Sequence, residues 1–148
     1  MQQNEIPDIF KDVNLNNSIE TDNLSQRAED VISGLRGNFV SSAKESILRM
    51  GDILKMIRDD EVAQSRVLPD SFFRMAHDIK GQGTTFGYPL LTELGVDICD
   101  ILRGRTSWSR QELNRIEQDL ADMHTVINMP YDSKGLFINK IKQRLKEK

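Results

Sequence analysis

A chain of 148 residues is long enough to bury one hydrophobic core, and its 20 basic and 23 acidic residues give it a net charge of −3. This mildly acidic balance argues against a nucleic-acid-binding surface, and no apolar run approaches the length of a membrane span. The single cysteine, Cys99, forms neither an internal disulfide nor a metal cluster, and the polar segment 1–17 has no apolar signal core. We therefore expect a single-domain protein of the reducing cytoplasm.

The N-terminal residues 1–22 are rich in Asn, Asp and Glu and show no sustained periodicity, which predicts a flexible tail. From Leu24 to Ile57, apolar residues recur every three or four positions, which predicts helical structure. Gly34 and Gly37 weaken the middle of this stretch, so a broken pair of helices is expected rather than one rod. The expected helices are about 24–36 and 38–60.

Two prolines mark the starts of the next two helices. Pro69 suits the first turn of a helix, because it lacks an N–H group there and has a helical φ angle. This helix is expected to end near Gly87, a C-cap residue. Pro89 then opens a further apolar helix, which is expected to end at Gly104.

The four residues 109–112, Ser-Arg-Gln-Glu, form a capping box that predicts the start of another helix, which stops before Pro130. A last helix with a basic face is expected over about 134–147, and the sequence shows no convincing strand and no repeat. We predict an all-α fold: an antiparallel four-helix bundle with additional N- and C-terminal helices. The domain would span 23–148, with its core over about 38–129.

The stretch 77–87, His-Asp-Ile-Lys-Gly-Gln-Gly-Thr-Thr-Phe-Gly, contains one of only two histidines, with a lysine one helical turn later. On a helical wheel at about 100° per residue, His77 lies opposite Ile79, which is on the predicted core face. His77 is therefore expected to face solvent, with Lys80 and Gly81 on the same side of the helix. The predicted core face consists of Phe72, Met75, Ala76, Ile79, Gly83 and Phe86.

Each residue type in this stretch suits phosphoryl transfer. A ring nitrogen of His77 can attack phosphorus, and the ammonium group of Lys80 would stabilise the negative charge on the transferred phosphoryl oxygens. Gly81 would remove bulk beside the ring, so that a partner's active site could close over it. Gly83 is expected to face the core, where its missing side chain permits close helix packing. Each mid-helix glycine costs about 1 kcal/mol relative to alanine, and such a broken local rule often marks a functional site.

The pattern His-x-x-Lys-Gly, a small residue two positions later, and Gly ten residues after the His resembles the histidine phosphotransfer (HPt) domain, especially that of chemotaxis histidine kinases. His77, Lys80, Gly81, Gly83 and Gly87 stand at these places. Glycine at position 83 is a minor departure, since the family often has Ser or Ala there. The resemblance implies a histidine-containing phosphocarrier of a two-component phosphorelay. In it, His77 would take a phosphoryl group from a receiver-domain aspartate or from a histidine kinase and pass it to another receiver.

The sequence shows neither a P-loop nor the Asp-x-Gly-x-Gly pattern of histidine-kinase ATP-binding domains, and it is too short to hold such a domain beside the bundle. We therefore expect a phosphotransfer intermediate without its own ATP site and without a bound cofactor or metal, rather than an enzyme. The Mg²⁺ needed for aspartyl phosphate chemistry would belong to the partner receiver domain. The expected partners are response-regulator receiver domains or a sensor histidine kinase. The protein is expected to be a monomer that binds neither nucleic acid nor membranes.

Two other functions remain open. A dimerisation and phosphoacceptor segment of a histidine kinase also presents a helical histidine, but it usually carries Pro a few residues later, where this chain has Gly81-Gln82-Gly83. A helical adaptor that has lost phosphotransfer is the third possibility, and the intact pair of His77 and Lys80 argues against it. Phe73, at the edge of the exposed arc, belongs either to the margin of the core or to an apolar docking patch.

Other chemically suggestive residues have ordinary explanations. His124 is a single helical histidine with no ligand partner in view, and Cys99 is predicted to be a buried structural thiol. Trp108 is expected to pack as a staple before the capping box. The basic residues of the last helix are expected to form a solvated face or, alternatively, a docking surface for acidic receivers. These residues are Lys134, Lys140, Lys142, Arg144, Lys146 and Lys148.

Overall fold

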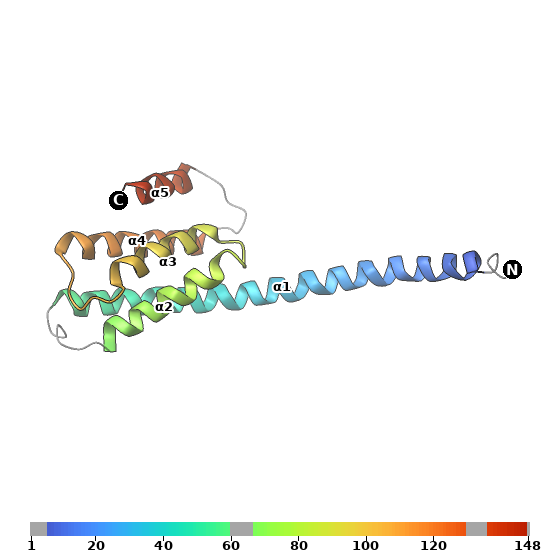
Figure 1. Ribbon diagram of the computed structural model, residues 1–148, viewed down its shortest axis with the longest axis horizontal. Coiled ribbons are helices and arrows are strands. Elements are labelled where there is room, and N and C mark those ends of the chain that lie inside the picture. Colours follow the sequence, from blue (N-terminus) through green and yellow to red (C-terminus); the bar gives the residue numbers. More distant parts are fainter. Residues whose placement is uncertain (1–5, 60–66, 130–135, 148) are drawn as a thin grey trace. The chain divides into compact units, whose positions relative to one another are not determined.

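The computed structural model describes the backbone of residues 6–59, 67–129 and 136–147. These residues form five helices and no strand, which confirms the predicted all-α fold (Figure 1). Within the described part of the chain, no helix combines the length and the apolar character that a membrane crossing requires. The helices are α1 (Ile6–Arg58), α2 (Val67–Gly83), α3 (Pro89–Leu102), α4 (Arg110–Asn128) and α5 (Leu136–Lys146).

The chain divides into two compact units, Met1–Gly37 and Asn38–Lys148. In the first unit, the apolar side chains of Leu24, Val31 and Leu35 are exposed by 62%, 60% and 48%. These apolar side chains are therefore regularly spaced along the helix but are not buried.

Helix α1 corrects two expectations from the sequence. It is continuous through Gly34 and Gly37, so the predicted break between residues 36 and 38 is wrong. A mid-helix glycine costs only about 1 kcal/mol, which weakens a long helix without ending it. The helix also begins at Ile6, whereas the first helix was expected to begin at about residue 24. Extending an existing helix into polar sequence needs no new nucleus.

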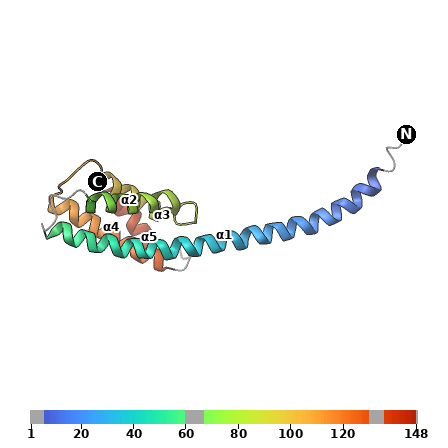
Figure 2. The ribbon, with the colours of Figure 1, turned by 90° about the horizontal axis from the view of Figure 1, so that it is seen from below.

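The second unit is built around one hydrophobic core, in which α3 packs against α2, α4 and α5. Successive helices α2, α3 and α4 run in opposite directions (Figure 1). The end of α1 lies beside α4 (Figure 2). There Arg58 donates hydrogen bonds to Asn114 at 2.8 Å and to Glu117 at 2.7 Å. The buried core residues are Phe39, Ala43, Ile47, Met50, Ile53, Leu54, Phe72, Ala76, Ile79, Tyr88, Leu90, Leu91, Leu94, Ile98, Cys99, Leu102, Ile116, Leu120, Met123, Val126, Ile127 and Ile141.

The helix starts agree closely with the sequence signals. Helix α3 begins at Pro89, and Pro69 lies in the first turn of α2, as predicted. The capping box is confirmed: the backbone N–H of Glu112 donates to Ser109 Oγ at 3.1 Å, and the Ser109 N–H donates to Glu112 Oε1 at 2.9 Å. Two orphan donors at the start of α4 are thereby satisfied.

The ends of α2 and α3 lie a few residues earlier than predicted, whereas α4 ends at Asn128, before Pro130, as predicted. Helix α2 ends at Gly83 rather than near Gly87, and α3 ends at Leu102 rather than at Gly104. Both later glycines adopt positive φ angles, 89° and 67°, in the turns that follow the helices. Left-handed backbone of this kind suits glycine because it has no Cβ. Gly104 directly follows the C-cap residue Arg103 of α3, whereas Gly87 lies four residues beyond the end of α2.

The basic C-terminal helix is only partly a solvated face. Lys140, Lys142 and Lys146 are exposed, whereas Arg144 is half-buried and pairs with two carboxylates of α4. Lys134 and Lys148 lie outside the described residues. The interpretation as a purely solvated face is thus wrong for Arg144, because the apolar side of α5 docks on the core and carries this residue into contact with α4.

Three buried aspartates accept hydrogen bonds from Arg144 and Arg115. Arg144 lies 2.7 Å from both Asp119 and Asp122, and Arg115 lies 2.7 Å from Asp97 of α3. Asp119 is fully buried, and its Oδ2 has no hydrogen-bond partner among the described residues. Burial, together with the neighbouring Asp97 carboxylate, raises the pKa of Asp119 to about 8. A proton on Asp119 would relieve the repulsion between these two carboxylates.

Candidate functional site

Helix α2 places His77 on its solvent-exposed side, as the helical wheel predicted. The opposite side of the helix packs into the core, with Met75 and Phe86 half-buried at its edges. An imidazole in this position is open to a protein partner without any movement of the helix. The fully buried residues of the predicted core face are Phe72, Ala76, Ile79 and Gly83.

Lys80 and Gly81 follow His77 by three and four residues, so they share its side of the helix. Lys80 is half-buried, and Gly81 is exposed. A Cβ atom added at Gly81 would meet no other atom within 4 Å. The fold therefore does not require glycine at this position, although glycine weakens the helix by about 1 kcal/mol relative to alanine.

Gly83 is a packing glycine, as predicted. A Cβ atom there would lie 2.6 Å from Thr92 Oγ1 and 2.9 Å from the carbonyl oxygen of Tyr88. The Tyr88 N–H in turn donates to the Gly83 carbonyl oxygen at 2.7 Å. The missing side chain thus lets α3 start directly against the end of α2.

Thr92 and Gly95 of α3 contact Lys80, and neither was predicted from the sequence as part of this site. Thr92 Oγ1 donates a hydrogen bond to the carbonyl oxygen of Lys80 at 3.1 Å and accepts one from the backbone N–H of Thr84 at 2.9 Å. A Cβ atom at Gly95 would lie 2.9 Å from Lys80 Cβ. The signal that could have revealed the second contact is a glycine inside an apolar helix, which often marks close backbone approach.

An aromatic ring separates His77 from a second cation. The Phe73 ring stacks on the His77 ring, with centroids 6.0 Å apart and an interplanar angle of 30°. The guanidinium carbon of Arg103 lies 6.0 Å from the centroid of the same Phe73 ring, within the range of a cation–π contact. Phe73 is half-buried and packs against the core, which confirms its place at the core margin. Arg103 was missed, because a basic residue just after an apolar helix carries no signal by itself.

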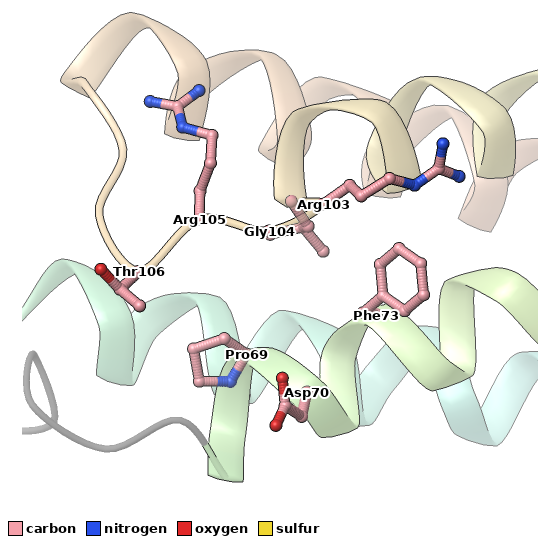
Figure 3. Close-up of a pocket in the computed structure, with 8 residues that line it drawn as sticks. Pro69, Asp70, Phe73, Arg103, Gly104, Arg105 and Thr106 are labelled. Carbon is pink, nitrogen blue, oxygen red and sulfur yellow. The ribbon is translucent and has the colours of Figure 1, made fainter.

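Phe73 and Arg103 also line a half-open pocket of about 280 Å³ between the start of α2 and the α3–α4 connection (Figure 3). In this view Arg103 extends over the Phe73 ring, whereas Arg105 points away from it. Arg105 instead pairs with Glu112, and this hydrogen bond holds the pKa of Glu112 at about 2. The rest of the pocket wall is formed mainly by Pro69, Asp70, Leu102, Gly104 and Thr106.

The remaining candidates from the sequence lie away from this face or are structural. His124 is exposed on α4, and Cys99 is fully buried, with the pKa of its thiol raised by burial. Trp108 is half-buried and donates from Nε1 to the carbonyl oxygen of Ile101 at 2.9 Å. Among the residues that the structure describes, no three His, Cys, Asp or Glu side chains are grouped so that they could hold a metal ion.

The exposed face of α2 thus combines a histidine, a lysine one turn later and a glycine that the fold does not need, beside an arginine held over an aromatic ring. An imidazole can act as a nucleophile, and the two cations can attract a negatively charged group to it. Comparisons with protein-family models, curated proteins and solved structures found no match to this chain.

Proposed function

We propose that this protein is a histidine-containing phosphocarrier of a two-component phosphorelay, with His77 as the phosphoacceptor. The observation that carries the proposal is the solvent-exposed His77 with Lys80 one turn later on the same helix. The open space around Gly81 supports it, because a glycine that packing does not require leaves room for another protein beside the ring.

The proposed domain is an antiparallel four-helix bundle of the HPt kind. Its helices would be the 38–58 part of α1 together with α2, α3 and α4. Support comes from the shared hydrophobic core, to which each of these four segments contributes buried side chains. The first part of α1 and the helix α5 would be additions at the two ends of the chain.

In the proposed reaction, the unprotonated ring nitrogen of His77 attacks the phosphorus of an aspartyl phosphate on a receiver domain. The N–P bond forms as the P–O bond to the aspartate breaks, and the carboxylate leaves with the electron pair of that bond. The proton on the other ring nitrogen passes to water. Lys80 stabilises the charge that spreads over the phosphoryl oxygens, and Arg103 adds a second positive charge over the Phe73 ring, which stacks on His77. Transfer onward to another receiver reverses these steps.

The proposal includes the partners and the place of the reaction. The protein would act in the cytoplasm as a monomer, exchanging phosphate with receiver domains or with a sensor histidine kinase. The receiver would supply the Mg²⁺ for its own aspartyl phosphate. Gly81 would give the receiver's aspartate access to His77.

Transfer of labelled phosphate to the protein tests the proposal. Incubation with a phosphorylated receiver domain or with a histidine kinase is expected to label the protein through an acid-labile, base-stable bond. His77→Gln should abolish the labelling and leave thermal unfolding unchanged, because His77 is exposed.

His124→Gln is the matched control, since His124 is also exposed on a helix but lies on α4. This variant should be labelled as well as the unsubstituted protein. Labelling that survives in the His77→Gln variant would contradict the proposal.

A further inference from the structure

The backbone of Lys80 rests on α3 at two points, and the two contacts differ in kind. One is the hydrogen bond from Thr92 Oγ1 to the Lys80 carbonyl oxygen, at 3.1 Å. The other is the close approach of Gly95, one turn further along α3. Both contacts join residues that lie at least a dozen positions apart in the sequence, so they exist only in the folded unit.

Gly95 leaves no room for a side chain. A Cβ atom there would lie 2.9 Å from Lys80 Cβ, 3.1 Å from Lys80 Cα and 3.1 Å from the carbonyl oxygen of Ala76. These are backbone atoms and the first atom of a side chain, not the flexible end of one. An alanine at this position would therefore push Lys80 and the neighbouring turn of α2 away from α3.

Thr92 supports the same turn of α2 from its C-terminal side. Its hydroxyl joins Lys80 to Thr84, because it donates to the carbonyl oxygen of the first and accepts from the N–H and the hydroxyl of the second. It also fills the space that Gly83 leaves open. The Lys80 carbonyl group, near the end of α2, is thus held by a side chain of α3.

The close approach of Gly95 restricts the first atoms of the Lys80 side chain. Its Cα and Cβ are held against α3, and the residue is half-buried, so the stem of its side chain moves less freely than that of a fully exposed lysine. His77 lies one turn earlier on the same helix, within reach of a residue three positions later. Restricting the stem of a lysine lowers the entropy that is lost when its ammonium group meets a phosphoryl oxygen.

We propose that Gly95 and Thr92 are positioning residues that hold Lys80 in place for phosphoryl transfer at His77. The proposal rests on the proposed phosphocarrier function. Neither residue touches the phosphoryl group, and both act through the main chain and the Cβ atom of Lys80.

The test uses phosphoramidate, a small phosphoryl donor, so that docking of a protein partner does not enter the measurement. Phosphorylation of His77 and loss of phosphate from it are followed by ³¹P NMR in the full chain. Gly95→Ala is expected to slow phosphorylation about tenfold, because small displacements of a charged group near a reacting centre have large effects on rate. Gly51→Ala is the matched control: Gly51 is also helical, and a Cβ atom there would meet nothing within 4 Å.

A double-mutant cycle shows whether Gly95 acts through Lys80. In the Lys80→Ala background, Gly95→Ala should cause no further loss of rate, because the group that it displaces is absent. An equal loss in both backgrounds, or no loss in either, would overturn the proposal. If the proposed function itself fails, the unsubstituted protein takes up no phosphate, a result that is visible before any variant is compared.

Thr92 provides a second pair of variants in case Gly95→Ala does not fold, which circular dichroism would reveal. Thr92→Val removes the hydroxyl and should slow phosphorylation, whereas Thr92→Ser keeps the hydroxyl and should restore most of the rate. The effect of Thr92→Val should also vanish in the Lys80→Ala background. Equal rates for the valine and serine variants would contradict a positioning role for this hydrogen bond.

Discussion

Gly81 and Gly83 are two residues apart on α2, yet their surroundings give them opposite roles. A side chain at Gly83 would collide with Thr92, whereas a side chain at Gly81 would enter open space. The sequence predicted both roles from the helical wheel, since one glycine falls on the core face and the other beside His77. How closely Gly83 is packed depends on the distance between α2 and α3, which a helical wheel does not describe.

Replacing Gly81 by alanine should separate stability from function. We expect Gly81→Ala to raise the free energy of unfolding by about 1 kcal/mol, because alanine favours helix and meets no neighbour. The same substitution should slow transfer from a phosphorylated receiver, whose active site must close over His77, more than phosphorylation by phosphoramidate. Denaturant unfolding and the two transfer rates measure these effects. Equal slowing with both donors would argue against a role in partner access.

At the scale of elements, the apolar face of α1 is exposed in its first part and buried in its second part. Its stripe continues at intervals of three or four residues from Leu24 into the second unit, but it is buried only from Phe39 onward. Phe39 stacks on Phe86 at 5.2 Å and lies 6.0 Å from Tyr88, in the connection between α2 and α3. The periodicity alone therefore identified the apolar face without showing which part of it is covered.

Two substitutions one turn apart on α1 should differ strongly in cost. Phe39→Ala is expected to lower the free energy of unfolding by about 3 kcal/mol, because it removes a 6%-exposed aromatic side chain from the core. Leu35→Ala should change it by less than about 0.5 kcal/mol, because Leu35 is 48% exposed. Urea denaturation followed by circular dichroism measures both values. A large loss for Leu35→Ala would show that this side chain is covered in solution.

At the scale of the whole molecule, buried charge couples α3, α4 and α5. Asp119 on α4 faces Asp97 from α3 and Arg144 from α5, with Asp122 on its own helix. Burial first and the Asp97 carboxylate second raise the pKa of Asp119 to about 8, against the opposing effect of Arg144. The folded protein therefore holds a proton at this site that the unfolded chain, with a carboxyl pKa of about 4, releases.

The stability of the protein should accordingly fall as the pH rises. The contribution of Asp119 is fully present below about pH 4 and is lost as the pH rises through about 8, with a slope of up to about 1.4 kcal/mol per pH unit. In the Asp119→Asn variant, whose side chain cannot ionise, the free energy of unfolding should decline less steeply with pH. Urea unfolding between pH 5 and pH 8.5 measures this free energy. The lowered pKa of Glu112, about 2, affects stability only at more acidic pH and does not overlap this range. An unchanged slope in the variant would refute the assignment to Asp119.

Local signals in the sequence accounted for much of the molecule. The all-α class, the starts of α3 and α4, the exposed position of His77 and the packing role of Gly83 follow from proline and capping chemistry and from the helical period. These features depend on residues within a few turns of one another, where geometry is nearly constant. The continuity of α1 was missed because the cost of a mid-helix glycine, about 1 kcal/mol, is small compared with the hydrogen bonds of the helix around it. Helix α2 ends early at a contact with another helix, where the Thr84 N–H donates to Thr92 of α3.

By itself, the sequence determined that this protein is helical and which face of α2 carries His77, Lys80 and Gly81. Only the tertiary structure decided that Arg103 stands over Phe73, that Thr92 and Gly95 contact Lys80, and that Arg144 leaves the basic face to pair with the buried Asp122. The reason is physical: each of these contacts joins residues on different helices, and the distance between helices depends on how their side chains fill the space between them.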